Sequence, residues 1–167
     1  MLGIVFAVRP ADVPERETGV PEDVALENAR AKALATARGP GEVVLGVDTL
    51  VATDEGIWGK PADEAAARAT LRHLAGRSHR VVSAVVLAGE DGVRSALDTT
   101  IVTFRELDEA AIEWYLGGGE WRRRAGGYAI QGRGGALVRH LEGDYLNVVG
   151  LPVAALLDLW PQLIVGR

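Results

Sequence analysis

Residues 80–104 read RVVSAVVLAGEDGVRSALDTTIVTF, and our interpretation of the fold starts from this stretch. Residues 80–87 are rich in β-branched side chains, and residues 93–104 form a second run of the same kind. Between them, Glu-Asp-Gly at 90–92 is typical of a turn. Two such runs joined by a short turn predict a β-hairpin.

Helices and further strands are expected on both sides of this hairpin. Apolar runs predict strands at 2–8, 42–47, 128–130 and 136–141, and the run at 42–47 reads as a buried strand that ends at Asp48. Helical spacing, acidic first turns and Gly or Pro stops predict helices at 22–38, 63–74, 108–116 and 152–160. Since neither class dominates, we expect an α/β or α+β protein with a mixed sheet.

The composition is that of a folded chain of one domain, spanning residues 1–167. Apolar residues make up 48% and charged residues 25%, which excludes a disordered chain. Cysteine is absent, which excludes disulfides, a thiolate nucleophile, Cys-ligated zinc and iron–sulfur clusters. With no apolar run of membrane-spanning length, we expect no membrane partner, and with no cysteine we expect a cytoplasmic location.

The charge balance bears on the partners of the protein. Lys and Arg total 18 against 23 Asp and Glu, a net charge of -5, so we expect no nucleic-acid partner. The densest basic run, residues 122–124, allows three interpretations: a nucleic-acid contact, a solvated loop, or anion binding beside the neighbouring glycines. On the interpretation of anion binding, we assign Arg124 to substrate binding.

Three further residues stand out as candidates for chemistry. Asp48 follows an apolar run, where a carboxylate can hold Mg²⁺ or activate water, or simply serve a turn. Lys60, in the turn sequence WGKP, can neutralise a phosphate or lie solvated. Lys32 and Lys60 are the two lysines of a chain that otherwise uses arginine. Because lysine and arginine are not interchangeable, this choice favours a role for the compact ammonium charge at both positions.

Several common motifs are absent from the sequence. Gly59-Lys60 resembles the end of a P-loop, but Pro61 follows where Ser or Thr is required. There is no dinucleotide-binding glycine fingerprint, no nucleophile elbow and no zinc-protease histidine pattern. The chemistry must therefore come from another arrangement of carboxylates and lysines.

Four segments in order carry a resemblance to a known family: LENARAKALA at 26–35, VLGVDTLV at 44–51, RAGGYAIQG at 124–132 and GDYLNVVGLPV at 143–153. With GKPADEAAARATLRHLAGRSHRVVSAV at 59–85, they closely resemble the Maf family of nucleoside triphosphate pyrophosphatases. The resemblance implies a fold related to the ITPase-like pyrophosphatases, a twisted mixed sheet with flanking helices and two lobes around a cleft. It also implies a homodimer.

The same resemblance implies a reaction and its participants. Water attacks the α-phosphorus of a nucleoside triphosphate and releases a nucleoside monophosphate and pyrophosphate, with Mg²⁺ or Mn²⁺ holding the phosphates. Asp48 matches the catalytic aspartate and a metal ligand, and Glu15 matches an acidic residue with a metal or water role. Lys32 and Lys60 match two phosphate-facing lysines.

Two further positions concern the choice of substrate. Thr49 and Gln131 match family positions linked to nucleotide preference, and they resemble the subgroup that prefers dTTP and UTP. A Gln amide offers both a donor and an acceptor, as the imide edge of a pyrimidine requires.

The chain departs from the family pattern in two places. Members usually begin with a strand and a Ser-Pro-Arg-Arg type loop before the segment matched here, so we expect a domain shortened at its N-terminus. Arg123 stands where small or acidic residues are more usual. The alternative hypothesis is therefore a weak or inactive nucleotide-binding protein with a role in septum or division control, and a third is RNA binding through residues 122–124.

Overall fold

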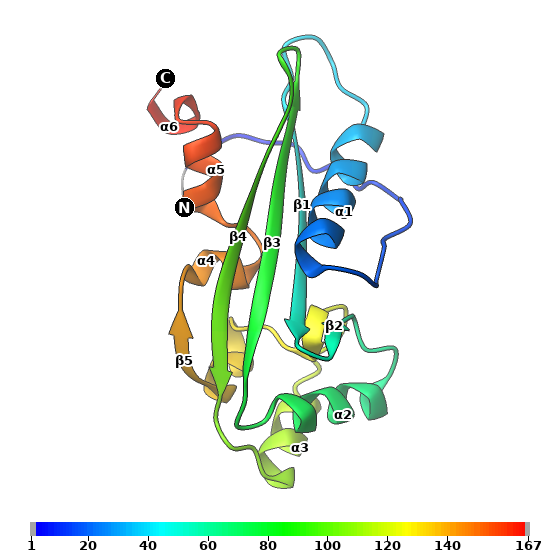
Figure 1. The fold of residues 1–167 in the computed structure, drawn as a ribbon, viewed down its shortest axis with the longest axis vertical. Helices are drawn as coiled ribbons and strands as arrows, with labels where there is room; N and C mark the ends of the chain where they lie inside the picture. Colours follow the sequence, from blue (N-terminus) through cyan, green and yellow to red (C-terminus); the bar gives the residue numbers. More distant parts are fainter. Residues whose placement is uncertain (1–2, 166–167) are drawn as a thin grey trace.

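The computed structural model describes residues 3–165, which form one sheet with helices around it (Figure 1). The strands are β1 Val44–Thr53, β2 Gly56–Trp58, β3 Ser78–Gly89, β4 Gly92–Phe104 and β5 Val138–Glu142. The helices are α1 Pro21–Ala35, α2 Glu64–Leu74, α3 Glu109–Gly117, α4 Tyr145–Val149, α5 Val153–Leu159 and α6 Gln162–Val165, with short 3-10 helices η1 Ala125–Gly127 and η2 Gly132–Leu137.

The predicted hairpin is confirmed and forms the centre of the sheet. The strand order is β2-β1-β3-β4-β5, and β3 pairs with β4 from Ser78 opposite Thr103 to Gly89 opposite Gly92. The α/β class with flanking helices is also confirmed. The pairing differs from the expected mixed sheet, because each strand pair within residues 3–165 is antiparallel.

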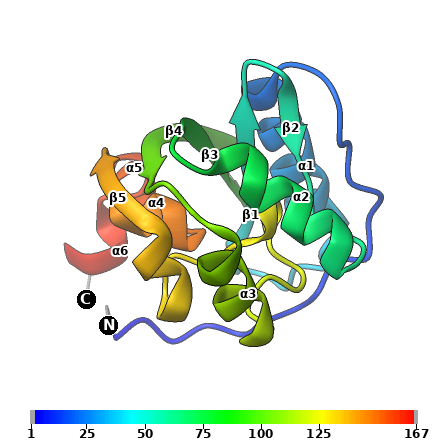
Figure 2. The ribbon, with the colours of Figure 1, turned by 90° about the horizontal axis from the view of Figure 1, so that it is seen from below.

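Two hydrophobic clusters use opposite faces of the sheet. Side chains of a strand alternate between its faces, so β3 contributes Val82, Ala84 and Val86 to one cluster and Val81 to the other. The first cluster lies under α1, and the second joins β1 and β4 to α2 and α3. Figure 2 shows α1 and α2 on one side of the molecule and α4, α5 and β5 on the other.

Helix α1 lies unusually close to β1. A Cβ built at Gly46 would come 2.3 Å from the carbonyl oxygen of Ala29 and 2.8 Å from the Cβ of Ala33. Only glycine permits this approach of backbone to backbone. The approach brings the side chains of α1 against the middle of β1.

Aspartate side chains cap two of the helices. Asp63 and Asp108 accept hydrogen bonds at 2.8 Å from the backbone N–H groups of Ala66 and Ala111, in the first turns of α2 and α3. Helix α1 ends at Ala35, three residues earlier than predicted, where Thr36 adopts an extended backbone conformation. Within residues 3–165 no helix combines the length and the apolar character needed to cross a bilayer.

Two predicted strands are wrong in the described residues. Residues 3–8 belong to no strand, because the segment runs along the periphery without joining the sheet (Figure 2), and Leu2 lies outside the described residues. Val5 and Phe6 are 90% and 78% exposed, so the apolar character of this segment does not signal burial. Residues 128–130 also lie outside any strand, in the connection between η1 and η2.

Candidate active site

Asp48 occupies the middle of β1, not its end. The sequence interpretation ended the strand at 47, but β1 continues to Thr53 because residues 50–52 are buried beneath neighbouring elements. The Asp48 side chain is only 6% exposed. Its Oδ1 accepts a hydrogen bond from Lys32 Nζ at 2.5 Å, and its Oδ2 accepts one from Asn28 Nδ2 at 3.0 Å.

Glu15 joins the two lysines of the chain. Its Oε1 lies 2.8 Å from Lys32 Nζ and its Oε2 lies 2.6 Å from Lys60 Nζ. Burial opposes ionisation of this carboxyl, but the hydrogen bonds from the two ammonium groups outweigh burial and lower the pKa of Glu15. Glu15 is therefore an anion held between two cations.

Lys32 is shared by the two carboxylates. Helix α1 presents Lys32 one turn after Asn28, so both side chains reach β1 from the same helix face. Partial burial works to lower the pKa of Lys32, but hydrogen bonds to Asp48 and Glu15 outweigh it and raise that pKa. The ammonium thus stays charged while it contacts both acids.

The turn that carries Lys60 is fastened to the loop that carries Arg124. The N–H of Gly126 donates to the carbonyl of Gly59 at 3.1 Å. Gly126 has a φ of 64°, and a Cβ there would come 2.9 Å from Val51. This glycine therefore allows the basic loop to lie against β1, beside the lysine turn.

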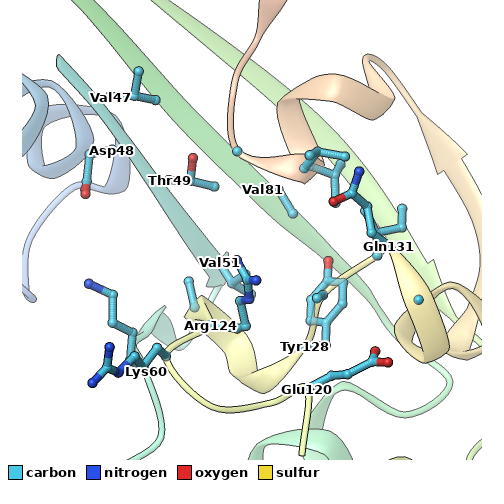
Figure 3. A pocket seen from close by; sticks show the side chains of 18 of the residues that line it. Val47, Asp48, Thr49, Val51, Lys60, Val81, Glu120, Arg124, Tyr128 and Gln131 are labelled. Carbon is cyan, nitrogen blue, oxygen red and sulfur yellow. The ribbon is translucent and has the colours of Figure 1, made fainter. Parts of the chain in front are cut away.

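A pocket of about 500 Å³ opens between these elements (Figure 3). It is lined by six residues that the sequence analysis selected, namely Lys32, Asp48, Thr49, Lys60, Arg124 and Gln131. Glu15, the seventh, contacts both lysines of this wall. The structure thus brings together all seven predicted site residues, while their individual roles stay predictions.

Thr49 and Gln131 also line the pocket. Thr49 Oγ1 is hydrogen-bonded at 2.8 Å to Ser83 Oγ of the neighbouring strand β3, and this contact fixes the position of the Thr49 hydroxyl. Gln131 lies between η1 and η2. Figure 3 shows Gln131 across the pocket from Asp48 and Lys60.

The basic run 122–124 divides between two environments. Arg123 and Arg124 line the pocket, whereas the Arg122 guanidinium lies 4.6 Å from the ring centroid of Trp121. Arg123 has a φ of 59°, a conformation that costs a non-glycine residue energy. The geometry matches anion binding better than a continuous nucleic-acid surface.

Sequence reasoning missed two residues of the site. Asn28 lies in the matched segment 26–35, but its helical position gave no chemical signal. Glu120 lines the pocket, and its carboxylate accepts hydrogen bonds from the N–H groups of Arg133 and Gly134. Asn147 is not part of the pocket lining, because it is fully buried and its amide donates to Val81 O and Thr100 Oγ1.

The donor set suits a hard cation that shares its ligands with phosphate. Within residues 3–165 no three His, Cys, Asp or Glu side chains gather closely enough to cage a metal ion. Asp48 and Glu15 supply two carboxylates around one ammonium. One or two carboxylates, completed by water and substrate phosphates, is the arrangement that Mg²⁺ prefers, so the residues present fit such an ion.

The fold and this pocket define an α/β protein whose pocket gathers lysine and arginine side chains beside two carboxylates. A family model described as "Maf-like protein" matches residues 1–163, and the chain belongs to the Maf family.

Three similar proteins each carry the name dTTP/UTP pyrophosphatase. A dTTP/UTP pyrophosphatase of Pyrococcus furiosus is 41% identical over 155 residues, 91% of this chain and 82% of its own length. One from Anaeromyxobacter dehalogenans is 46% identical over 159 residues, 92% of this chain and 80% of its own. One from Sphingopyxis alaskensis is 50% identical over 135 residues, 80% of this chain and 71% of its own.

Proposed function

We propose that this protein hydrolyses dTTP and UTP to the nucleoside monophosphate and pyrophosphate. The observation that carries the proposal is the contact of Lys32 with both Asp48 and Glu15 at the wall of a pocket of nucleotide size. The names of the similar proteins supply the substrates, and the pocket residues supply chemistry of the required kind.

The cations of the pocket bind the triphosphate in this proposal. Lys32, Lys60 and Arg124 come from three different segments of the chain, and all three line the pocket. Positive groups fixed in advance stabilise the charge that develops when the bond between the α- and β-phosphates breaks. A divalent metal held by Asp48 and Glu15 would add Lewis-acid stabilisation of the phosphate oxygens.

Asp48 orients the attacking water and accepts its proton. Lys32 and Asn28 each occupy one position on the carboxylate, and a carboxylate has about four lone-pair sites, so both oxygens retain acceptor capacity. Its burial shields it from bulk water, which strengthens its interactions with the reacting groups. The water oxygen then forms the new bond to the α-phosphorus, and pyrophosphate leaves.

Thr49 and Gln131 select the base. The amide of Gln131 can donate to a carbonyl and accept from the N–H of a uracil or thymine imide edge. Ser83 holds the Thr49 hydroxyl in one orientation, which gives the site a fixed hydrogen-bonding group. These roles extend the proposal from the reaction to its preference for dTTP and UTP.

The test is pyrophosphate release from UTP, dTTP, CTP and GTP, each with Mg²⁺ and with Mn²⁺. We expect release from UTP and dTTP that requires a divalent metal and that falls by at least about 10²-fold in Asp48→Asn, the lower range of a lost acid–base group. Full activity in Asp48→Asn overturns the role of Asp48. Nucleotide binding without turnover in the wild type overturns the proposed reaction and favours the nucleotide-binding alternative. The homodimer and the cytoplasmic location stay predictions.

A further inference from the structure

Asn28 is a buried amide with three hydrogen bonds. Its side chain lies on α1 and the residue is 3% exposed. Nδ2 donates to Asp48 Oδ2 and to the carbonyl of Arg16, each at 3.0 Å, and Oδ1 accepts from the Arg16 N–H at 2.8 Å. One side chain therefore contacts the reacting carboxylate and the residue next to Glu15.

The partners fix which way the amide points. Asp48 Oδ2 and the Arg16 carbonyl are both acceptors, and the Arg16 N–H is a donor. A flipped amide would set an oxygen against two acceptors and an NH₂ group against a donor. The environment permits one orientation, so the amide donates to Asp48.

The segment that carries Glu15 has little structure of its own. Residues 3–17 belong to neither a helix nor a strand. The two hydrogen bonds between Asn28 and the Arg16 backbone attach this segment to α1 directly after Glu15. Because Lys32 lies one turn further along the same helix, the attachment also sets the reach of Glu15 to that ammonium.

We propose that Asn28 is a positioning residue that fixes Asp48 and the Glu15 segment relative to each other. The inference deepens the proposed function and rests on it, because its importance for turnover depends on the roles given to Asp48 and Glu15. It assigns to Asn28 the part that outer hydrogen-bond partners play for ligating carboxylates.

The experiment compares three variants with the wild type. Asn28→Ala removes all three hydrogen bonds. Asn28→Asp keeps an acceptor for the Arg16 N–H but sets a second carboxylate oxygen against Asp48. Asn147→Ala is the matched control, since Asn147 is also a buried asparagine that donates two hydrogen bonds, and its side chain lies outside the pocket.

Kinetics give the first readout. We expect Asn28→Ala to lower kcat or to raise the Mg²⁺ concentration for half-maximal activity by about 10- to 100-fold, the usual cost of losing an outer partner. Asn28→Asp should change the same kinetic constants at least as much as Asn28→Ala does. Asn147→Ala loses as much thermal stability as Asn28→Ala but changes both kinetic constants less than threefold.

Hydrogen exchange gives a readout that does not depend on turnover. Within residues 12–20 of Asn28→Ala, the backbone N–H of Arg16 should exchange at least about tenfold faster than in the wild type, because it has lost its acceptor. Asn28→Asp should retain more of the wild-type protection there, and Asn147→Ala should retain all of it.

The outcomes separate the two proposals. If the wild type is active and Asn28→Ala matches Asn147→Ala in kinetics and in exchange over 12–20, Asn28 is not a positioning residue. If exchange rises uniformly over the whole chain, the role of Asn28 is general stability and the inference is wrong. If the wild type releases no pyrophosphate but the local exchange effect is present, the proposed reaction fails while the attachment of the Glu15 segment holds.

Discussion

Gly46 of β1 and Ala29 of α1 lie so close that a Cβ on the glycine would come 2.3 Å from the alanine carbonyl oxygen. This contact holds the helix that carries Lys32 against the strand that carries Asp48. Gly46→Ala should therefore push α1 outward. We expect a loss of about 1–3 kcal/mol in the free energy of unfolding, the usual cost of overpacking, together with reduced kcat.

Urea unfolding and pyrophosphate release measure these two effects. Gly117→Ala is the control, because a Cβ there meets no atom within 4 Å and the residue lies in the last turn of α3. That variant should match the wild type or gain up to about 1 kcal/mol, as alanine favours a helix over glycine. Equal stability of the two variants would contradict the proposed role of the contact.

The two lysines should respond differently to the same substitution. Lys32→Met leaves Asp48, 6% exposed, without its ammonium, so we expect a loss of about 1–3 kcal/mol of stability as well as activity. Lys60 is 53% exposed, and Lys60→Met should cost less than about 1 kcal/mol while raising the KM for UTP. Thermal melts and steady-state kinetics check both, and a stable Lys32→Met protein would be evidence against the burial argument.

Stability should fall between about pH 6.5 and pH 4 because of His79. Burial lowers the pKa of this histidine to about 4, and its Nε2 lies 2.8 Å from the Tyr128 hydroxyl. In this range the unfolded chain binds a proton that the folded protein does not, so acid favours unfolding. The contribution is of the order of 3 kcal/mol, at about 1.36 kcal/mol per pKa unit.

Replacement of His79 separates its contribution to the pH dependence of stability from the contribution of the carboxylates. His79→Gln keeps an amide partner for Tyr128 and removes the titrating group. We expect the free energy of unfolding of this variant to vary less with pH between 6.5 and 4 than that of the wild type. Identical pH dependence in the two proteins would show that His79 is not responsible.

Glu120 should control the loop that presents Gln131. Its carboxylate accepts from the Arg133 N–H at 2.9 Å and from the Gly134 N–H at 3.4 Å, and a Cβ on Gly132 would lie 2.8 Å from it. Glu120→Ala should raise the KM for UTP several-fold with a smaller change in kcat, and Glu120→Gln, which retains an acceptor, should lie between it and the wild type. A change confined to kcat would instead place Glu120 in the chemical step.

Local signals in the sequence predicted most of the fold. The hairpin of β3 and β4 followed from β-branched runs and a Glu-Asp-Gly turn, and the helices predicted at 63–74 and 108–116 correspond to α2 and α3. The strand predicted at 2–8 is wrong over residues 3–8, because apolar content alone does not provide a neighbouring strand to pair with. The antiparallel pairing of β1 with β3 depends on how the chain returns after α2, which residue patterns do not record.

The candidate site was found through family motifs more than through physical pattern. Asp48 was selected partly because it was expected at a strand end, yet it lies within β1, so that physical reason was wrong. Asn28 and Glu120 carry no distinctive local pattern, because their importance comes from contacts with residues 12 to 20 positions away. Such contacts exist only in the folded chain.

The most direct measurement is hydrolysis of UTP in ¹⁸O-labelled water, with mass analysis of both products. Attack on the α-phosphorus, with Asp48 orienting the water, places one ¹⁸O atom in UMP and none in pyrophosphate. Label in pyrophosphate would contradict attack at that phosphorus. UDP and inorganic phosphate as the products would contradict the proposed reaction altogether.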